Sequence, residues 1–313
     1  MTENMILDAP EIPETPEIHK KKNSHRFEKR LALIAAGLAA LAALMTVLCL
    51  PYFGQEEDDP ELLLQSQPQA TMPLPTEDPE ASTEPEFPPP EKNPYGKLDF
   101  QYSGRYLSCL KADTVPGIDV SYYQGQIDWK QVKESGIQFA IIRLGYRGYG
   151  EEGKLAEDKM AFKNLDGALK AGLDVGVYFF SQAITVEEAL EEADFVLERI
   201  GKYDLTMPVV YDWEYISEEA RTANMDRRTL TECYKAFCSK IADAGYTPMP
   251  YFNTFQSRSL MVLSELEEYP FWLALYSDRM TFPYRIEMWQ YTDSGKVPGI
   301  QGNVDINIYF TEE

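Results

Sequence analysis

The sequence predicts an α/β fold for residues 92–313: an irregular (β/α) barrel of the TIM-like type, with its core at about 115–310. From about Val115, short apolar runs alternate with amphipathic stretches, which is the pattern of βαβ units and a parallel sheet. Eight apolar runs are present, and eight parallel strands are enough to close a barrel. An open doubly wound sheet is the alternative, but no glycine-rich phosphate-binding pattern follows the first run.

Each apolar run is interpreted as a buried strand. The runs are Val115–Val120, Phe139–Tyr146, Val175–Phe180, Met207–Glu214, Met249–Asn253, Phe271–Tyr276, Ile286–Tyr291 and Val304–Tyr309. Between the earlier runs lie helical patterns, several of them followed by glycine, as helix ends prefer. These patterns cover Trp129–Ser135, Leu155–Ala171, Val186–Ile200, Leu230–Ala244 and Ser257–Glu268. Because helical patterns thin out after residue 268, we expect the barrel to be irregular at its C-terminal end.

The chain before the barrel begins with a polar tail, residues 1–30, that ends in a basic cluster. Residues 31–50 then form twenty positions without a charge, the length that a helix needs to cross a bilayer. Basic residues precede this span and acidic residues follow it, which predicts a single-pass anchor at 31–53 with a cytoplasmic N-terminus. A signal peptide cleaved near Ala40-Leu41-Ala42 is the alternative, although its apolar region is usually shorter.

Residues 54–91 are predicted to be a disordered linker. They contain eleven acidic residues, nine prolines and neither Lys nor Arg. Such a segment cannot bury enough apolar surface to offset its ordering entropy, and its charges repel one another. We therefore expect an extended spacer of at most about 3 Å per residue.

Charge and histidine content exclude several classes of function. The net charge is −22, and residues 92–313 alone carry 34 acidic against 23 basic side chains, which argues against a nucleic-acid partner. Both histidines, His19 and His25, precede the apolar span. Ser-His-Asp, Cys-His and histidine-ligated zinc mechanisms are therefore removed from the external domain. No CxxC pair is present, so the sequence predicts neither a metal site nor a cofactor.

A pair of carboxylates closes the run that begins at Met207. Strand side chains alternate between faces, so Asp212 and Glu214 point the same way, roughly 7 Å apart along the backbone, while Trp213 turns aside. Two carboxylates on one face of a strand end suit the hydrolysis of a glycosidic bond. Two solvated acids at a strand end are the alternative.

Other acidic and aromatic residues gather at the expected strand exits, where barrel enzymes carry their active sites. The exits are Asp119, Arg143 or Tyr146, Phe180, Asp212 with Glu214, Asn253, Tyr276, Gln290 with Tyr291, and Asp305 with Asn307. Flat aromatic side chains suit the apolar faces of sugar rings. The candidates are Tyr178, Phe180, Tyr211, Trp213, Tyr251, Tyr276, Trp289 and Tyr291, some of which are expected to pack in the core. Arg143 is expected to balance buried acids.

Seven blocks, in order, resemble the glycoside hydrolase family 25 lysozymes over about residues 115–310. They are Gly117–Gly125 with Ile127–Trp129, Phe139–Arg143, Gly176–Phe180, Pro208–Glu214, Trp272–Ala274, Trp289–Tyr291 and Gly299–Asn307. Many members of the family have Tyr-His-Phe where this chain has Tyr178-Phe179-Phe180. This departure leaves the carboxylates untouched.

The resemblance implies a flattened (β/α) barrel that cuts the β-1,4 bond between N-acetylmuramic acid and N-acetylglucosamine in peptidoglycan. It implies Glu214 as the general acid, with Asp212 as its partner, and Asp119 and Asp305 as flanking acids. Asp212 would orient the substrate's own N-acetyl group for attack on the anomeric carbon, which we favour. In an inverting route, Asp212 or Asp119 would activate water instead.

With the anchor, these expectations place the enzyme on the outside of a bacterial cell membrane, next to peptidoglycan. The tether would hold it near its substrate without a wall-binding module. A catalytically silent glycan-binding or scaffold domain is one alternative, and a glycosidase of other N-acetylated glycans is another.

Overall fold

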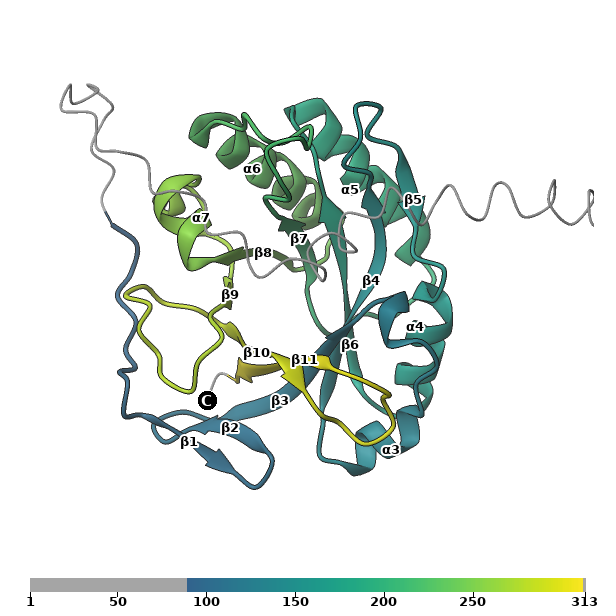
Figure 1. The fold of residues 1–313 in the computed structure, drawn as a ribbon, viewed down its shortest axis with the longest axis vertical. Helices are drawn as coiled ribbons and strands as arrows, with labels where there is room; N and C mark the ends of the chain where they lie inside the picture. Colours follow the sequence, from purple (N-terminus) through teal and green to yellow (C-terminus); the bar gives the residue numbers. More distant parts are fainter. Residues whose placement is uncertain (1–88, 312–313) are drawn as a thin grey trace, which may run out of the picture. The chain divides into compact units, whose positions relative to one another are not determined.

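The computed structural model describes residues 89–311 (Figure 1). The predicted cytoplasmic tail, membrane anchor and most of the linker lie outside the described residues. Among residues 89–311, no helix is long and apolar enough to cross a membrane.

Eight strands form a closed barrel. In the order of the sheet they are β3 (Thr114–Val120), β11 (Val304–Phe310), β10 (Met288–Gly295), β9 (Trp272–Ala274), β8 (Pro248–Asn253), β7 (Val209–Trp213), β6 (Asp174–Ser181) and β4 (Phe139–Arg147). Pairing of β3 with β4 closes the ring. The eight predicted strands and the barrel are therefore confirmed.

One strand departs from the predicted parallel sheet. β11 runs antiparallel to both of its neighbours, β10 and β3, whereas the remaining neighbours in the ring are parallel. An antiparallel strand can follow its neighbour through a short loop, and so no crossover helix is needed after β10. This agrees with the expected irregularity at the C-terminal end.

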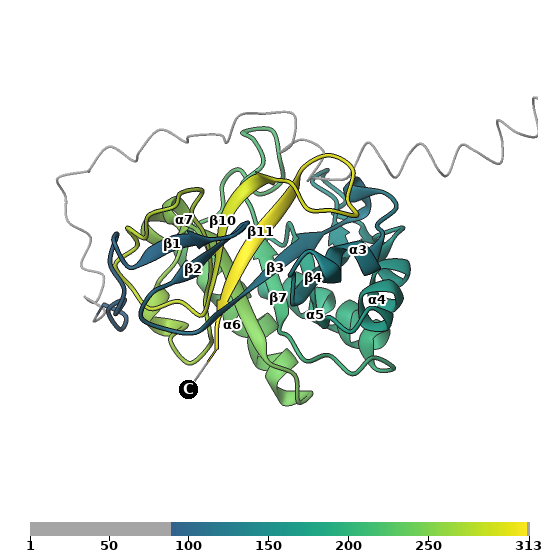
Figure 2. The same ribbon diagram turned by 90° about the horizontal axis from the view of Figure 1, so that it is seen from below.

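Helices cover the outer side of the barrel along its first strands (Figures 1 and 2). They are α3 (Trp129–Glu134), α4 (Ala161–Lys170), α5 (Val186–Ile200), α6 (Arg227–Asp243) and the short α7 (Thr254–Ser259), with 3-10 turns η1 (Tyr122–Gln124) and η2 (Leu263–Glu265). Polar side chains cap several of their N-termini: Asp128 for α3, Thr185 for α5 and Asp226 for α6.

Two predicted helices are shorter than expected. Leu155–Glu157 forms β5, which pairs antiparallel with the end of β4, and the helix starts only at Ala161. Asp158 lies between them and accepts a hydrogen bond from the backbone N–H of Met160, a turn that breaks the periodic pattern. The pattern predicted over Ser257–Glu268 is likewise split into α7 and η2.

The side chains of each strand alternate between the inside and the outside of the barrel, and they form one apolar cluster on each side. Along β7, Val210 packs inside the barrel, while Val209, Tyr211 and Trp213 pack outside it against the helices. The interior is tight at the middle of β3, where a Cβ on Gly117 would lie 2.3 Å from the ring carbons of Phe139. This close approach explains the glycine at that position.

A hairpin that the sequence analysis did not predict covers β10 and β11, where helices are absent (Figure 2). It consists of β1 (Phe100–Ser103) and β2 (Tyr106–Cys109). The ring of Phe100 packs edge-on against Trp289, with centroids 5.0 Å apart, and the backbone N–H of Leu107 donates to the hydroxyl of Tyr291 at 3.3 Å. The hairpin thus completes the outer layer of the barrel.

Candidate active site

Four carboxylates lie at the end of the barrel where the parallel strands finish. Asp119 is near the end of β3, Asp212 is the penultimate residue of β7, and Glu214 follows that strand directly. Asp305 stands directly opposite Asp119, because β11 runs antiparallel and begins where β3 ends. All four acids predicted from the sequence therefore share one end of the fold.

Two amide side chains hold the acids on the β3 side. The Nε2 group of Gln290 donates to Oδ1 of Asp119 at 2.9 Å and to Oδ2 of Asp305 at 3.3 Å. The Nδ2 group of Asn307 donates to the same Oδ1 of Asp119 at 2.7 Å. Both amides are buried, so their placement relative to the carboxylates is fixed by packing.

Aromatic hydroxyl and indole groups orient these amides. Tyr251 and Tyr276 donate their hydroxyl hydrogens to Oε1 of Gln290, at 2.9 and 3.2 Å, which turns its Nε2 group toward the acids. The indole N–H of Trp272 donates to Oδ1 of Asn307 at 2.9 Å and orients that amide in the same manner.

The electrostatics of the site agree with this network. Burial raises the pKa of Asp119, against the hydrogen bonds from Asn307 and Gln290, which favour its ionised form. Burial and nearby negative groups, including Glu214 and Asp119, hold the pKa values of Tyr251 and Tyr276 well above their usual range. The two tyrosines therefore remain protonated donors at any pH at which the fold is expected to work.

The Asp212 and Glu214 pair follows the predicted alternation. Asp212 is buried and Glu214 is half-buried, whereas Trp213 between them is fully buried on the outer face. The indole N–H of Trp213 donates to the backbone oxygen of Ala183 at 3.1 Å. Trp213 is thus a structural residue that turns away from the acids, as expected.

The aromatic residues predicted to bind substrate divide between two faces. Tyr178, Phe180 and Tyr251 belong to the interior cluster, and Tyr276 is 38% exposed beside Gln290. In contrast, Tyr211, Trp289 and Tyr291 lie on the outer face, buried under α6 or under the β1–β2 hairpin. A sugar bound at the barrel end cannot reach those three rings, because strand alternation points them away from it.

Arg143 and Phe179 also have structural positions. Arg143 is fully buried, and its Nε group pairs with Oδ2 of Asp158 at 2.8 Å, as the expectation of a charge-balancing arginine requires. Phe179, which stands where many family members have histidine, faces outward and packs edge-on against Phe195 of α5. The departure from the family pattern therefore lies away from the four acids.

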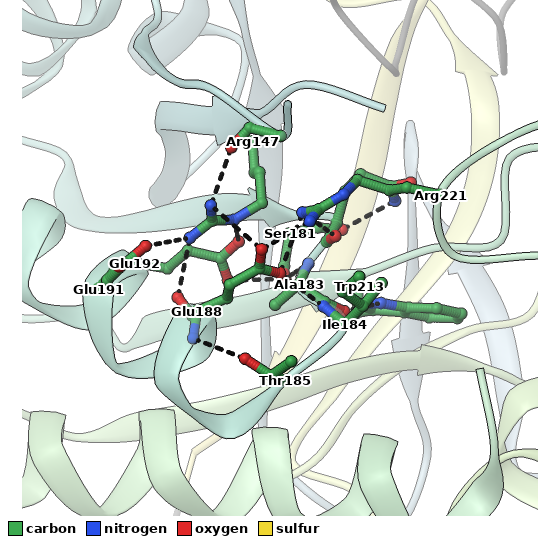
Figure 3. Close-up of polar contacts among 12 residues, drawn as sticks. Arg147, Ser181, Ala183, Ile184, Thr185, Glu188, Glu191, Glu192, Trp213 and Arg221 are labelled. Carbon is green, nitrogen blue, oxygen red and sulfur yellow. Dashed lines mark hydrogen bonds and ion pairs between the residues drawn. The ribbon is translucent and has the colours of Figure 1, made fainter. Parts of the chain in front are cut away.

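A second polar cluster lies behind β7, outside the barrel (Figure 3). The buried Glu192 accepts from Nε of Arg147 at 2.7 Å and from the hydroxyl of Ser181 at 2.7 Å. Ser181 also contacts the hydroxyl of Tyr211 at 2.8 Å. Glu188 binds Arg221, with contacts of 2.5 and 3.0 Å. No sequence pattern predicts this cluster, because its members come from five separate segments: β4, β6, α5, β7 and the loop after β7.

An eight-stranded barrel with acids and tyrosines gathered where its parallel strands end has the architecture of a barrel enzyme. The chain belongs to the glycosyl hydrolases family 25, whose model matches residues 118–300. Within residues 89–311, no group of three or more His, Cys, Asp or Glu side chains is arranged to hold a metal ion.

Known proteins of this family resemble the chain at low sequence identity. Lysozyme M1 of Streptomyces globisporus is 28% identical over 211 residues, which cover 63% of this chain and 68% of that protein. The modular autolysin LytC of Streptococcus pneumoniae, solved in complex with a synthetic peptidoglycan ligand, is 29% identical with a TM-score of 0.55. That match covers 63% of this chain and 47% of the autolysin, so the chain spans about half of its length. A lysozyme of Streptomyces coelicolor is 25% identical with a TM-score of 0.51, covering 64% of this chain and 93% of that one.

Proposed function

We propose that this protein is a muramidase that hydrolyses the β-1,4 bond between N-acetylmuramic acid and N-acetylglucosamine in peptidoglycan. The observation that carries the proposal is the gathering of Asp119, Asp212, Glu214 and Asp305 at one end of the barrel. Membership of family 25 and the peptidoglycan ligand of the LytC complex support the choice of substrate.

In this proposal Glu214 is the general acid that protonates the leaving oxygen. It is half-buried at the strand exit, so it can meet a glycan while its neighbours stay inside. A general acid must carry a proton near neutral pH so that it can donate this proton to the leaving oxygen.

Asp212 acts on the same face as Glu214. We favour a route in which it orients the substrate's N-acetyl group for attack on the anomeric carbon. An inverting route, in which Asp212 or Asp119 activates water, is the alternative. Asp119 and Asp305 lie at the same end of the barrel and share the amide donor of Gln290.

Four aromatic residues are proposed to contact the glycan or to shape its site. Tyr276 is the exposed member and offers a ring face to a sugar, while its hydroxyl remains bound to Gln290. Tyr178, Phe180 and Tyr251 belong to the interior apolar cluster, and Phe180 and Tyr251 lie level with Asp212 in the register of the sheet.

We further propose that residues 31–50 anchor the enzyme in a bacterial cell membrane with the barrel on the wall side. The support is the uncharged length of that segment and the basic residues that precede it. Residues 54–91 would then serve as an extended tether that keeps the barrel near peptidoglycan.

The test is to incubate the full-length chain with purified peptidoglycan and to identify the new reducing ends. The wild type is expected to release muramic-acid reducing ends. In Glu214→Gln the rate of this release should fall at least about 100-fold, because the amide cannot donate the proton. Glu134→Gln, a change of the same kind at a 64% exposed side chain on α3, should keep the wild-type rate.

Three other results would contradict the proposal in separate ways. Reducing ends at glucosamine would point to a glycosidase of different specificity. Binding to peptidoglycan without any cleavage would point to a silent glycan-binding domain. Equal rates for the wild type and Glu214→Gln would remove Glu214 from the role of acid.

A further inference from the structure

Two buried glutamine side chains hold the main chain at the proposed acid. β7 pairs with β6 as far as Trp213, opposite Ser181, and with β8 as far as Asp212, opposite Tyr251. The carbonyl groups that follow need donors from elsewhere. Nε2 of Gln256, from the start of α7, donates to the carbonyl oxygen of Trp213.

The next carbonyl, that of Glu214 itself, accepts from Nε2 of Gln182 at 2.7 Å. Gln182 directly follows the last residue of β6 and is fully buried. Successive carbonyl groups of a strand point to opposite neighbours. Accordingly, Gln256 comes from the β8 side and Gln182 from the β6 side, and the two side chains continue the hydrogen bonding of the sheet past the end of β7.

The orientation of the Gln182 amide is fixed by its other contacts. Its Oε1 accepts from the hydroxyl of the buried Thr222 at 3.0 Å, and its Nε2 also donates to the carbonyl of Ser181 at 2.8 Å. Because a hydroxyl donates to Oε1, the amide nitrogen must face the two carbonyl oxygens.

The loop that carries Gln182 is itself braced by the polar cluster behind β7 (Figure 3). Arg221 donates to the backbone oxygen of Gln182 at 3.0 Å and pairs with Glu188 at the start of α5. One residue further on, the carbonyl of Ala183 accepts from the indole of Trp213. The loop after β6 and the end of β7 are thus joined on either side of Glu214.

We propose that Gln182 is a positioning residue for Glu214: its side-chain amide fixes the backbone of the acid so that the carboxyl group is held at the barrel end. This inference rests on the proposed muramidase function. A general acid must stay within hydrogen-bond reach of the leaving oxygen, and a displacement of about 1 Å can cost on the order of 100-fold in rate. Gln182 itself is buried and does not touch the glycan.

The experiment measures kcat and KM of the full-length chain on soluble peptidoglycan glycan strands, with the folded fraction determined by circular dichroism. Gln182→Ala is expected to lower kcat about 10- to 100-fold per folded molecule and to change KM by less than about twofold. The matched control is Gln138→Ala. Gln138 also donates Nε2 to a backbone carbonyl, that of Gly136 at 2.9 Å, but directly before β4, at the opposite end of the barrel. The Gln138→Ala variant should keep kcat within about twofold of the wild-type value.

A second variant separates positioning from general loss of structure. In Gln182→Glu, a neutral carboxyl can donate to a carbonyl oxygen, whereas an ionised one can only accept and repels it. The ratio of the variant's kcat to that of the wild type is therefore expected to rise as pH falls from 8 to 5, while the ratio for Gln182→Ala stays flat. A flat ratio for Gln182→Glu would count against the proposal.

If Gln182→Ala does not fold, Thr222→Val removes only the hydroxyl that orients the amide, and Thr222→Ser restores it. Thr222→Val should lower kcat at least about threefold, with near wild-type kcat in Thr222→Ser. A folded Gln182→Ala or Thr222→Val with wild-type kcat overturns the proposal, as does a raised KM with unchanged kcat. If the wild-type chain itself releases no reducing ends, the proposed muramidase function is wrong. This outcome differs from a failure of the Gln182 proposal, in which the wild type is active and the variants keep its kcat.

Discussion

Glu192 is a buried acid whose charge state affects the free energy of unfolding. Burial raises its pKa to about 7, against the opposing effects of Arg147, Ser181 and Tyr211. Between its ordinary value and 7, the folded state holds a proton that the unfolded state releases. Stability is therefore highest below that window and falls as pH rises through it, by on the order of 3 kcal/mol from this residue alone.

The test compares urea unfolding of the wild type and Glu192→Gln from pH 4.5 to pH 8. All other groups titrate in both proteins, so the difference between the two unfolding free energies isolates Glu192. We expect the wild type to lose stability relative to the variant as pH rises. Parallel pH curves would show that Glu192 stays ionised throughout, held by Arg147.

Single residues show what a sequence can and cannot reveal about the site. The four acids could be predicted because alternation and strand exits depend only on local sequence. The same alternation places Tyr211 with Trp213 on the outer face, against the expectation of a sugar contact. Gln290 was placed at a strand exit, but its contacts to two acids were not predicted, and Gln182 gave no signal at all. The reason is that an amide acquires its role only from the groups that tertiary packing brings to it.

At the scale of elements, the β1–β2 hairpin makes a prediction about stability. Phe100 is 8% exposed and packs against Trp289, so truncating it opens the outer layer over β10. Phe100→Ala is expected to cost about 3 kcal/mol in the free energy of unfolding. Leu98→Ala, beside it but 86% exposed, should cost less than about 0.5 kcal/mol.

The measurement is urea unfolding at one pH for the wild type and both variants. Activity per folded molecule should be unchanged in Phe100→Ala, because the hairpin lies on the outer face and the acids lie inside. Equal, small losses in the two variants would mean that the hairpin does not stabilise the barrel.

Elements that lie within a long periodic or apolar pattern were predictable, and several short elements without such a pattern were missed. α5 matches its predicted bounds, Val186–Ile200, because a long amphipathic pattern with a Thr185 cap has few alternatives. β1, β2 and β5 have only three or four residues each and draw their stability from partners distant in the fold or across a turn. No local pattern of that length distinguishes a strand from a loop.

At the scale of the whole molecule, the prediction of a closed barrel depended on the number of strands found in the sequence. The sequence predicted eight, but the antiparallel direction of β11 follows only from the short connection after β10, which leaves no room for a crossover helix. This direction matters for the site, because it brings Asp305 to the same end as Asp119.

The proposed anchor and tether can be tested by fractionating cells that produce the protein. In membrane fractions of cells that express the full-length chain, the protein should sediment with membranes and resist extraction by high salt, because about 20 uncharged residues insert into the bilayer. Deletion of residues 1–53 together with export by an unrelated cleavable signal should move it to the soluble external fraction with kcat on soluble strands unchanged. Its rate on intact walls should fall at equal total protein, because the tether raises the local concentration of enzyme at the wall. If cells that express the full-length gene release a protein cleaved near Ala40-Leu41-Ala42, residues 31–50 belong to a cleaved signal peptide and the anchor is refuted.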